Sequence, residues 1–236
     1  MLDISKIKAL TFDTGGTILD WHSGFSKGFE ELKKKYKFNY SSVELANLMR
    51  KKSLEKITNQ NPNSLINFDV AHKHAVEEII RDNKLEISNE DLFKLYYFYP
   101  SQLKAWPDFL SPFNDLKNFF VCVSFTLLSN RLVYKNSKSN QISWDLVLSC
   151  ETLEVYKPNL EAYKKTAHLL QFKPEECMMV ACHSFDLNAA QKAGFKTAFV
   201  KREHEWGINT KINIDGNYDV VVDNFFQLKE FLNVNS

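Results

Sequence analysis

Short apolar runs recur along the chain, and segments with helical periodicity separate several of them. Runs of this length bounded by turn residues are typical of buried strands. The predicted strands are 7–13, 121–129, 146–150, 178–183, 196–201 and 218–222. A helix is predicted over 159–170, where one apolar stripe contains Leu160, Tyr163, Ala167 and Leu170. Strands that alternate with helices predict an α/β fold, a Rossmann-like, doubly wound parallel sheet with both faces covered.

The segment 21–99 lacks the alternating pattern of a strand and carries apolar stripes at helical spacing instead. One stripe contains Phe25, Phe29, Leu32 and Tyr36. The run from Ser41 to Glu44 matches a capping box, which marks the start of a further helix. We therefore predict an all-helical cap domain, 20–104, inserted into an α/β core formed by 1–19 and 105–236. A cap placed directly after the first strand can cover a site at the end of the sheet and exclude water.

The composition is that of an ordinary globular protein, with 44% hydrophobic and 25% charged residues among 236. A net charge of +1 gives no electrostatic reason to expect nucleic acid or an anionic membrane as a partner. No apolar run is long enough to span a bilayer, and no signal-peptide pattern precedes the first predicted strand. The four cysteines show neither CxxC nor zinc-site spacing, which favours buried, reduced thiols in a cytoplasmic protein.

Asp13 ends the first apolar run and opens the turn Thr14-Gly15-Gly16-Thr17. Ligands of open α/β sheets bind beyond the carboxyl ends of the strands, which is where this carboxylate is expected. An aspartate there can act as a nucleophile and form a covalent ester. The alternative is that Asp13 only caps the turn.

Polar residues also follow the later strands. Ser129 and Asn130 end the run at 121–128, Lys157 precedes the helix at 159–170, and Asp186 follows the run at 178–183. A nucleophile, a hydroxyl or amide donor, an ammonium group and a second carboxylate are complementary parts of one active site. Each residue alone has a simpler explanation, such as a turn or a helix cap. Their order along the chain favours a shared site.

Three stretches carry a resemblance to a known family. They are FDTGGTILDW at 12–21, WPD at 106–108 and VACHSFDL at 180–187, followed by Arg202 and EWG at 205–207. These motifs resemble those of the haloacid dehalogenase superfamily, α/β hydrolases with a helical cap, and are most similar to its 2-haloacid dehalogenase branch. The similarity extends over about 7–207.

Gly15 separates the two main activities of this superfamily. Phosphatases that the chain resembles carry a second aspartate two residues after the nucleophile, where it protonates the leaving alcohol. Gly15 has no proton to give at this position. Halide is a very weak base and leaves without protonation, so the glycine favours dehalogenation over phosphate-ester hydrolysis.

The resemblance implies a hydrolytic dehalogenation without a cofactor or a required metal. Asp13 would displace halide from a small 2-haloacid, and water would hydrolyse the aspartyl ester to give a 2-hydroxy acid. Lys157 would hold Asp13 ionised, and Asp186 would position Lys157 or the water. Arg50 would draw off the halide, although its neighbours Lys51 and Lys52 also allow a solvated helix face.

The resemblance also implies a set of substrate contacts. Ser129 would bind the substrate carboxylate, Asn130 would hold the halide, and His183 would orient the water. Thr17 and Trp21 of the first motif are expected beside the substrate, with cap–core packing as the alternative for Trp21. The expected partner is a small-molecule carboxylate, and the tendency of the family is a homodimer.

Two other functions stay open at this point. A phosphatase that lacks the usual acid could hold Mg²⁺ with Asp13, the carbonyl of Gly15 and Asp186, because this ion prefers oxygen ligands. A degenerate member that binds a ligand without catalysis is the other. It is suggested by Gly15, Ala181 and Cys182, which replace aromatic or hydroxyl side chains found in relatives.

Overall fold

The computed structural model of the chain describes residues 2–208 and 210–233. Six parallel strands form one sheet in the order β5-β4-β1-β6-β7-β8. They are β1 (Ala9–Phe12), β4 (Val121–Thr126), β5 (Leu146–Ser149), β6 (Cys177–Ala181), β7 (Lys196–Val200) and β8 (Val220–Val222). The predicted α/β fold and its six strands are confirmed, although each strand is shorter than the apolar run that predicted it.

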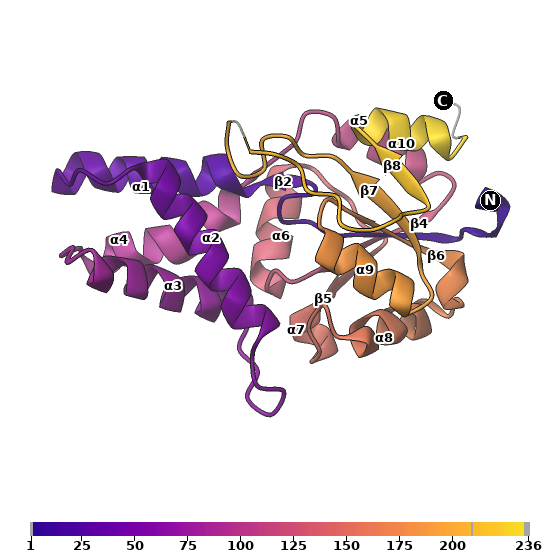
Figure 1. Cartoon of the computed structure of the whole chain (residues 1–236), viewed down its shortest axis with the longest axis horizontal. Coiled ribbons are helices and arrows are strands. Elements are labelled where there is room, and N and C mark those ends of the chain that lie inside the picture. The colour runs from indigo at the N-terminus through magenta and orange to yellow at the C-terminus, as the bar shows by residue number, and fades with distance from the viewer. Residues whose placement is uncertain (1, 209, 234–236) are drawn as a thin grey trace.

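Helices cover both faces of the sheet (Figure 1). On one face lie α5 (Leu110–Leu116) and α10 (Phe225–Phe231), and on the other lie α8 (Leu160–Leu170) and α9 (Ser184–Lys192). The remaining helical elements of this part of the chain are η1 (Ile4–Lys6), α6 (Asn130–Ser139), α7 (Cys150–Leu153) and η4 (Pro174–Glu176). Aromatic rings fill the first interface, where Phe12 lies 5.8 Å from Phe113 between ring centroids. At the second, Phe125 lies 5.2 Å from Tyr163. Burial of such rings is a large favourable term in folding.

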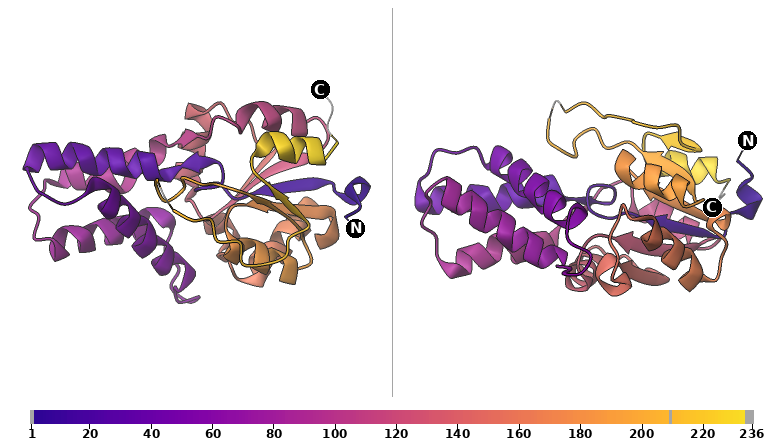
Figure 2. Two further views of the ribbon diagram at one scale, coloured as in Figure 1. Left: turned by 45° about the horizontal axis from the view of Figure 1, so that its top comes forward. Right: turned by 60° about the horizontal axis from the view of Figure 1, so that its bottom comes forward.

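The segment after the first strand is helical, as its apolar stripes predict. It contains α1 (Trp21–Tyr36), α2 (Ser42–Thr58), α3 (Phe68–Asp82), α4 (Asn89–Phe93), the π-helix η2 (Lys94–Phe98) and the 3₁₀-helix η3 (Tyr99–Gln102). Ser41 is the N-cap of α2, and its side chain accepts a hydrogen bond from the amide of Glu44. Figures 1 and 2 place these helices beyond the carboxyl ends of the parallel strands.

Two short strands join the helical segment to the sheet domain. β2 (Leu19–Asp20) and β3 (Lys104–Ala105) pair antiparallel, so the chain leaves and returns at one point. Two residues are too few to produce a recognisable alternating pattern, which is why the sequence does not predict them. The exact division into a core and a cap stays a prediction. Within the described ranges, no helix has the length and apolarity that a membrane crossing requires.

Candidate active site

Asp13 lies at the point where the sheet reverses its winding. The last residue of β1, Phe12, pairs with Ser124 of β4 on one side and with Val180 of β6 on the other. The amide of Asp13 donates to the carbonyl of Val180 over 3.0 Å, which continues the ladder by one residue. Such a switch point is where open α/β sheets bind their ligands.

The turn after Asp13 brings the chain back onto its carboxylate. Gly16 has a φ of 100°, which glycine adopts readily, and a Cβ atom at Gly16 would collide with the carboxylate of Glu205. This turn lets the hydroxyl of Thr17 donate to Asp13 Oδ2 over 2.8 Å. Thr17 is fully buried, so its contact favours a role in positioning Asp13.

Two cationic side chains flank the carboxylate of Asp13. Lys157 Nζ lies 3.6 Å from Oδ1, and His183 Nδ1 lies 3.1 Å from Oδ2. Burial opposes ionisation, but Lys157 and His183 outweigh it and hold the pKa of Asp13 well below its usual range. The carboxylate is therefore ionised at neutral pH, as a nucleophile must be.

Lys157 is held in place by Asp186 and has no solvent exposure. Its Nζ lies 2.6 Å from Asp186 Oδ2 and 4.3 Å from the ring centroid of Phe125. Asp186 Oδ1 accepts a hydrogen bond of 2.6 Å from the hydroxyl of Tyr163. The N-cap residue of α9 is His183, so Asp186 does not cap this helix. Its contacts favour the role of positioning Lys157.

A second carboxylate, Glu205, lies on the far side of His183. His183 Nε2 is 2.8 Å from Glu205 Oε1, and Trp21 Nε1 donates to the same oxygen over 2.9 Å. Burial opposes the imidazolium, but Cys182, Glu205 and Asp13 together raise the pKa of His183 well above its usual value. With a carboxylate at each ring nitrogen, both nitrogens act as donors and the ring carries a positive charge.

Arg50 reaches from α2 into the site and is buried, so the alternative of a solvated helix face is wrong. Its Nη2 donates to the carbonyl of Gly15 over 2.8 Å, and its guanidinium lies 5.3 Å from the ring centroid of Trp21. A Cβ atom at Gly15 would lie 3.4 Å from both terminal nitrogens. A larger side chain there would displace the guanidinium, so the glycine makes room for Arg50.

The contacts of Arg50 and Lys157 affect two of the three Mg²⁺ ligands that the sequence suggests for a phosphatase. In that set the carbonyl of Gly15 and the carboxylate of Asp186 are ligands. Here each of them already binds a cationic side chain. These partners disfavour a divalent cation at the same place, because like charges repel.

Ser129 and Asn130 bind carboxylates of the chain itself. The hydroxyl of Ser129 donates to Asp69 of α3 over 2.6 Å. The side-chain amide of Asn130 donates to Glu151 over 3.0 Å, and Asn67 donates to the other oxygen of Glu151 over 2.8 Å. Both predicted substrate-binding residues thus join the helical segment to the sheet domain. Their roles toward a substrate stay predictions.

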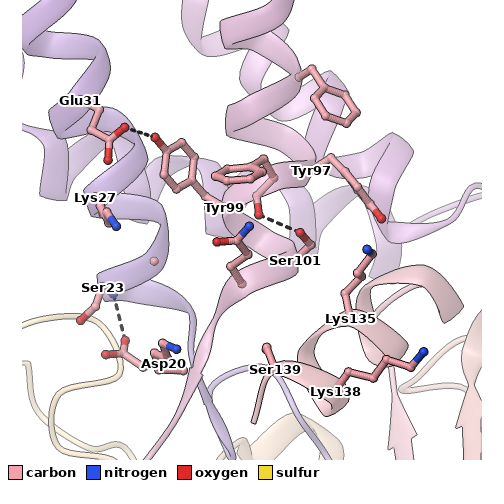
Figure 3. Close-up of a pocket in the computed structure, with 15 residues that line it drawn as sticks. Asp20, Ser23, Lys27, Glu31, Tyr97, Tyr99, Ser101, Lys135, Lys138 and Ser139 are labelled. Carbon is pink, nitrogen blue, oxygen red and sulfur yellow. Dashed lines mark hydrogen bonds between the residues drawn. The ribbon is translucent and has the colours of Figure 1, made fainter.

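The space beside Asp13 is small. A cavity of about 10 Å³ is lined by Asp13 and by Gly15, Arg50, Leu54, Phe68, Thr126, Leu127, Leu128, His183 and Phe185. This volume holds roughly one water molecule. A larger cavity of about 900 Å³ lies between α1, η2, η3 and α6, with Lys27, Lys135 and Tyr99 on its walls (Figure 3). Its lining includes none of the residues that contact the carboxylate of Asp13.

Glu205, Tyr163 and Asp69 contact the predicted site residues, yet the sequence gives them no role. Glu205 lies in a segment without regular structure, and Tyr163 belongs to an ordinary apolar helix stripe. The one signal in the sequence for a role of Glu205 is its place in the EWG stretch at 205–207, which resembles a motif of the family. Asp69 lies in the first turn of α3, where acidic residues are common.

Comparison with known proteins adds a family and a set of similar structures. A family model described as haloacid dehalogenase-like hydrolase matches residues 10–200. The (S)-2-haloacid dehalogenase 4A of Burkholderia cepacia is 28% identical over 207 residues, which cover 85% of each chain. The structure of the L-2-haloacid dehalogenase PA0810 is similar with a TM-score of 0.88 at 24% identity, covering 97% of this chain and 100% of that one. The L-2-haloacid dehalogenase from Xanthobacter autotrophicus with chloropropionic acid covalently bound has a TM-score of 0.83 at 19% identity, with coverage of 98% and 100%.

Proposed function

Because the chain belongs to the haloacid dehalogenase-like hydrolase family, we propose that it hydrolyses the carbon–halogen bond of a small 2-haloacid. The observation that carries this proposal is the environment of Asp13. Its carboxylate is ionised between Lys157 and His183, and the guanidinium of Arg50 binds the carbonyl of Gly15, the position at which a phosphatase carries its acid. Similar proteins are named (S)-2-haloacid dehalogenases, which supports the same chemistry.

In the first step, an oxygen of Asp13 attacks C2 of the substrate and the carbon–halogen bond breaks. Oδ1 is the better placed oxygen, because its contact with Lys157 is 3.6 Å long whereas Oδ2 binds Thr17 and His183. The halide leaves with the bonding electrons toward the guanidinium of Arg50. An aspartyl ester remains, and no proton is transferred.

In the second step, water adds to Cγ of the ester. Negative charge then develops on Oδ2, which lies within hydrogen-bond distance of the hydroxyl of Thr17 and Nδ1 of His183. Such preorganised donors stabilise an oxyanion. As the bond between Cγ and Oδ1 breaks, one proton of the water is transferred to Oδ1, and the 2-hydroxy acid departs with this oxygen. The second proton of the water is released to solvent, which leaves Asp13 as a carboxylate. Glu205 would act as a positioning residue that keeps His183 charged.

The substrate carboxylate is proposed to bind Ser129 in place of Asp69. Asp69 is the natural competitor because it already presents a carboxylate to this hydroxyl. Burial raises the pKa of Asp69 despite the hydrogen bond from Ser129 and the nearby Arg131. A substrate carboxylate that binds Ser129 would thus replace the carboxylate of Asp69, which is poorly solvated in its buried position.

The test of this proposal is halide release from L-2-chloropropionate and chloroacetate in the presence of EDTA. We expect release by the wild-type protein, and we expect EDTA to leave the rate unchanged because no step uses a metal. Hydrolysis of a phosphate ester that requires Mg²⁺, without halide release, would contradict the proposal and favour the phosphatase. Neither activity in the folded protein would favour a non-catalytic binder.

Replacing Arg50 with alanine is expected to lower kcat/KM for dehalogenation about 100-fold, which corresponds to ~2.7 kcal/mol. The reason is that the departing halide would lose its cationic partner in a site with little water. The matched control is Lys51→Ala, which removes an exposed cation from the same helix and is expected to leave kcat/KM unchanged. Steady-state halide release measures both variants. A change within about twofold for Arg50→Ala, under roughly 0.5 kcal/mol, would remove Arg50 from the mechanism.

A further inference from the structure

We propose that Cys182, His183 and Glu205 form a binding site for a thiophilic divalent cation of the Zn²⁺ type. Within 2–208 and 210–233, this is the one group in which three Cys, His, Asp or Glu side chains bring ligand atoms within 4.8 Å of one another. A thiolate, an imidazole and a carboxylate are the ligand types that Zn²⁺ takes in proteins. The proposal does not depend on the dehalogenase reaction.

The distances between the three side chains fit a tetrahedral site closely. Cys182 Sγ lies 3.5 Å from His183 Nε2 and 3.7 Å from Glu205 Oε2. Zinc bonds of the usual length at tetrahedral angles place their ligand atoms roughly 3.3–3.6 Å apart. The two distances to Glu205 involve different oxygens, since Oε1 lies 2.8 Å from His183 Nε2 and Oε2 lies near Cys182 Sγ, so the carboxylate has to adjust before one oxygen can bind the cation. One ligand atom from each of the three side chains lies within 4.8 Å of the others.

The neighbours of these ligands resemble the surroundings of zinc sites in general. A ligating imidazole usually donates its other N–H group to a carboxylate, which fixes its orientation. His183 meets this condition, because its Nδ1 lies 3.1 Å from Asp13 Oδ2. The indole N–H of Trp21 holds Glu205 in a similar way.

The site is open on one side. Cys182, His183 and Glu205 line a cavity of about 290 Å³, together with Arg202 and Trp206 among others. A cation bound to the three side chains could take water or a small ligand from this cavity as its fourth partner. The other three cysteines are buried, so Cys182 is the thiol in the described ranges that a cation could reach most easily.

The charges of the three side chains and the softness of the thiolate both favour one class of cation. The cation would replace two protons, one from the thiol of Cys182 and one from Nε2 of His183. The resulting thiolate and the carboxylate of Glu205 would supply two negative charges to a divalent cation, and Arg50 is the other cationic side chain that acts on Glu205. A soft thiolate favours Zn²⁺ or Co²⁺, whereas Mg²⁺ prefers oxygen ligands.

The test is a titration of the full chain with Co²⁺, followed by its absorption spectrum in the absence of substrate. We expect a thiolate-to-cobalt charge-transfer band that saturates at one ion per chain. Zn²⁺ should displace it, and an excess of Mg²⁺ should not. Absence of the band in the folded wild-type protein would overturn the proposal.

Two variants assign the ligands, and a third is the matched control. Cys182→Ser should abolish the band, and Glu205→Gln should weaken Zn²⁺ binding at least tenfold in competition with a chromophoric chelator. His204→Asn removes an exposed imidazole next to Glu205 and should change neither result. A band that persists in Cys182→Ser would assign the metal to another thiol and contradict the proposal. If Cys182→Ser fails to fold, unchanged Zn²⁺ affinity of Glu205→Gln would contradict it instead.

Discussion

Replacing Asp13 with asparagine is expected to lower halide release at least about 10,000-fold, a loss of ~5.4 kcal/mol in transition-state stabilisation. The amide keeps the shape of the side chain but is a far weaker nucleophile, and the reaction needs a new bond from this oxygen to carbon. The amide oxygen can still accept the hydrogen bond from Thr17, and Lys157 keeps its pairing with Asp186, so the fold should persist. Halide release at saturating substrate measures the effect.

The control for this variant is an aspartate a few residues further along the chain. Asp20 is the N-cap of α1 and accepts a hydrogen bond from the amide of Ser23. Asparagine caps helices as well as aspartate, so Asp20→Asn should keep both stability and activity. A second readout is a single turnover in water labelled with heavy oxygen, which should place the label in Asp13 and leave the first product molecule unlabelled. Full activity of Asp13→Asn, or label in that product, would mean that water attacks C2 directly.

Replacing Lys157 with methionine is expected to lower kcat about 1,000-fold, or ~4 kcal/mol. Methionine fills most of the same volume but leaves the carboxylates of Asp13 and Asp186 buried without their shared cation. The pKa of Asp13 should then rise, and less of the nucleophile would be ionised. Unfolding should also become easier by roughly 3–5 kcal/mol, as it does when one partner of a buried pair is removed. Stopped-time halide assays and denaturant unfolding measure the two effects.

A double variant separates catalysis from stability. Lys157→Met combined with Asp186→Asn removes one of the two uncompensated charges, so it should recover part of the lost stability and none of the activity. Lys164→Met is the matched control, because this lysine is exposed on α8 and pairs with the exposed Glu161. Near-normal rates in the double variant would show that another group activates Asp13, and would remove Lys157 from the mechanism.

The sequence predicts the part of the site that the parallel strands build. Asp13 and Asp186 each follow an apolar run, strands that run parallel bring their ends to one edge of the sheet, and Lys157 contacts both carboxylates. The order of strands along the chain is therefore enough to expect these side chains together. The helical nature of 21–102 is predicted equally well, because its stripes are long and periodic.

The remaining part of the site depends on how separate segments meet, which no local pattern encodes. Arg50 lies in a basic run, and only the packing of α2 on the turn at Gly15 shows that it points inward. Glu205 follows the last long strand in an irregular segment, so nothing periodic marks its approach to His183. Asp69 contacts Ser129 across the boundary between the two parts of the chain, a contact that needs the full tertiary structure.

Under the proposed role of Ser129, its hydrogen bond with Asp69 would make the protein its own competitive ligand. While this bond is formed, the hydroxyl of Ser129, which is the proposed contact of the substrate carboxylate, is occupied by Asp69. The cavity beside Asp13 then has a volume of only about 10 Å³. Substrate would then bind only the fraction of molecules in which this hydrogen bond is broken, and the apparent dissociation constant would be the intrinsic one divided by that fraction. A small open population would weaken affinity for every haloacid alike. The strength of this one internal contact would thus set a concentration threshold for turnover, separately from the chemistry at Asp13.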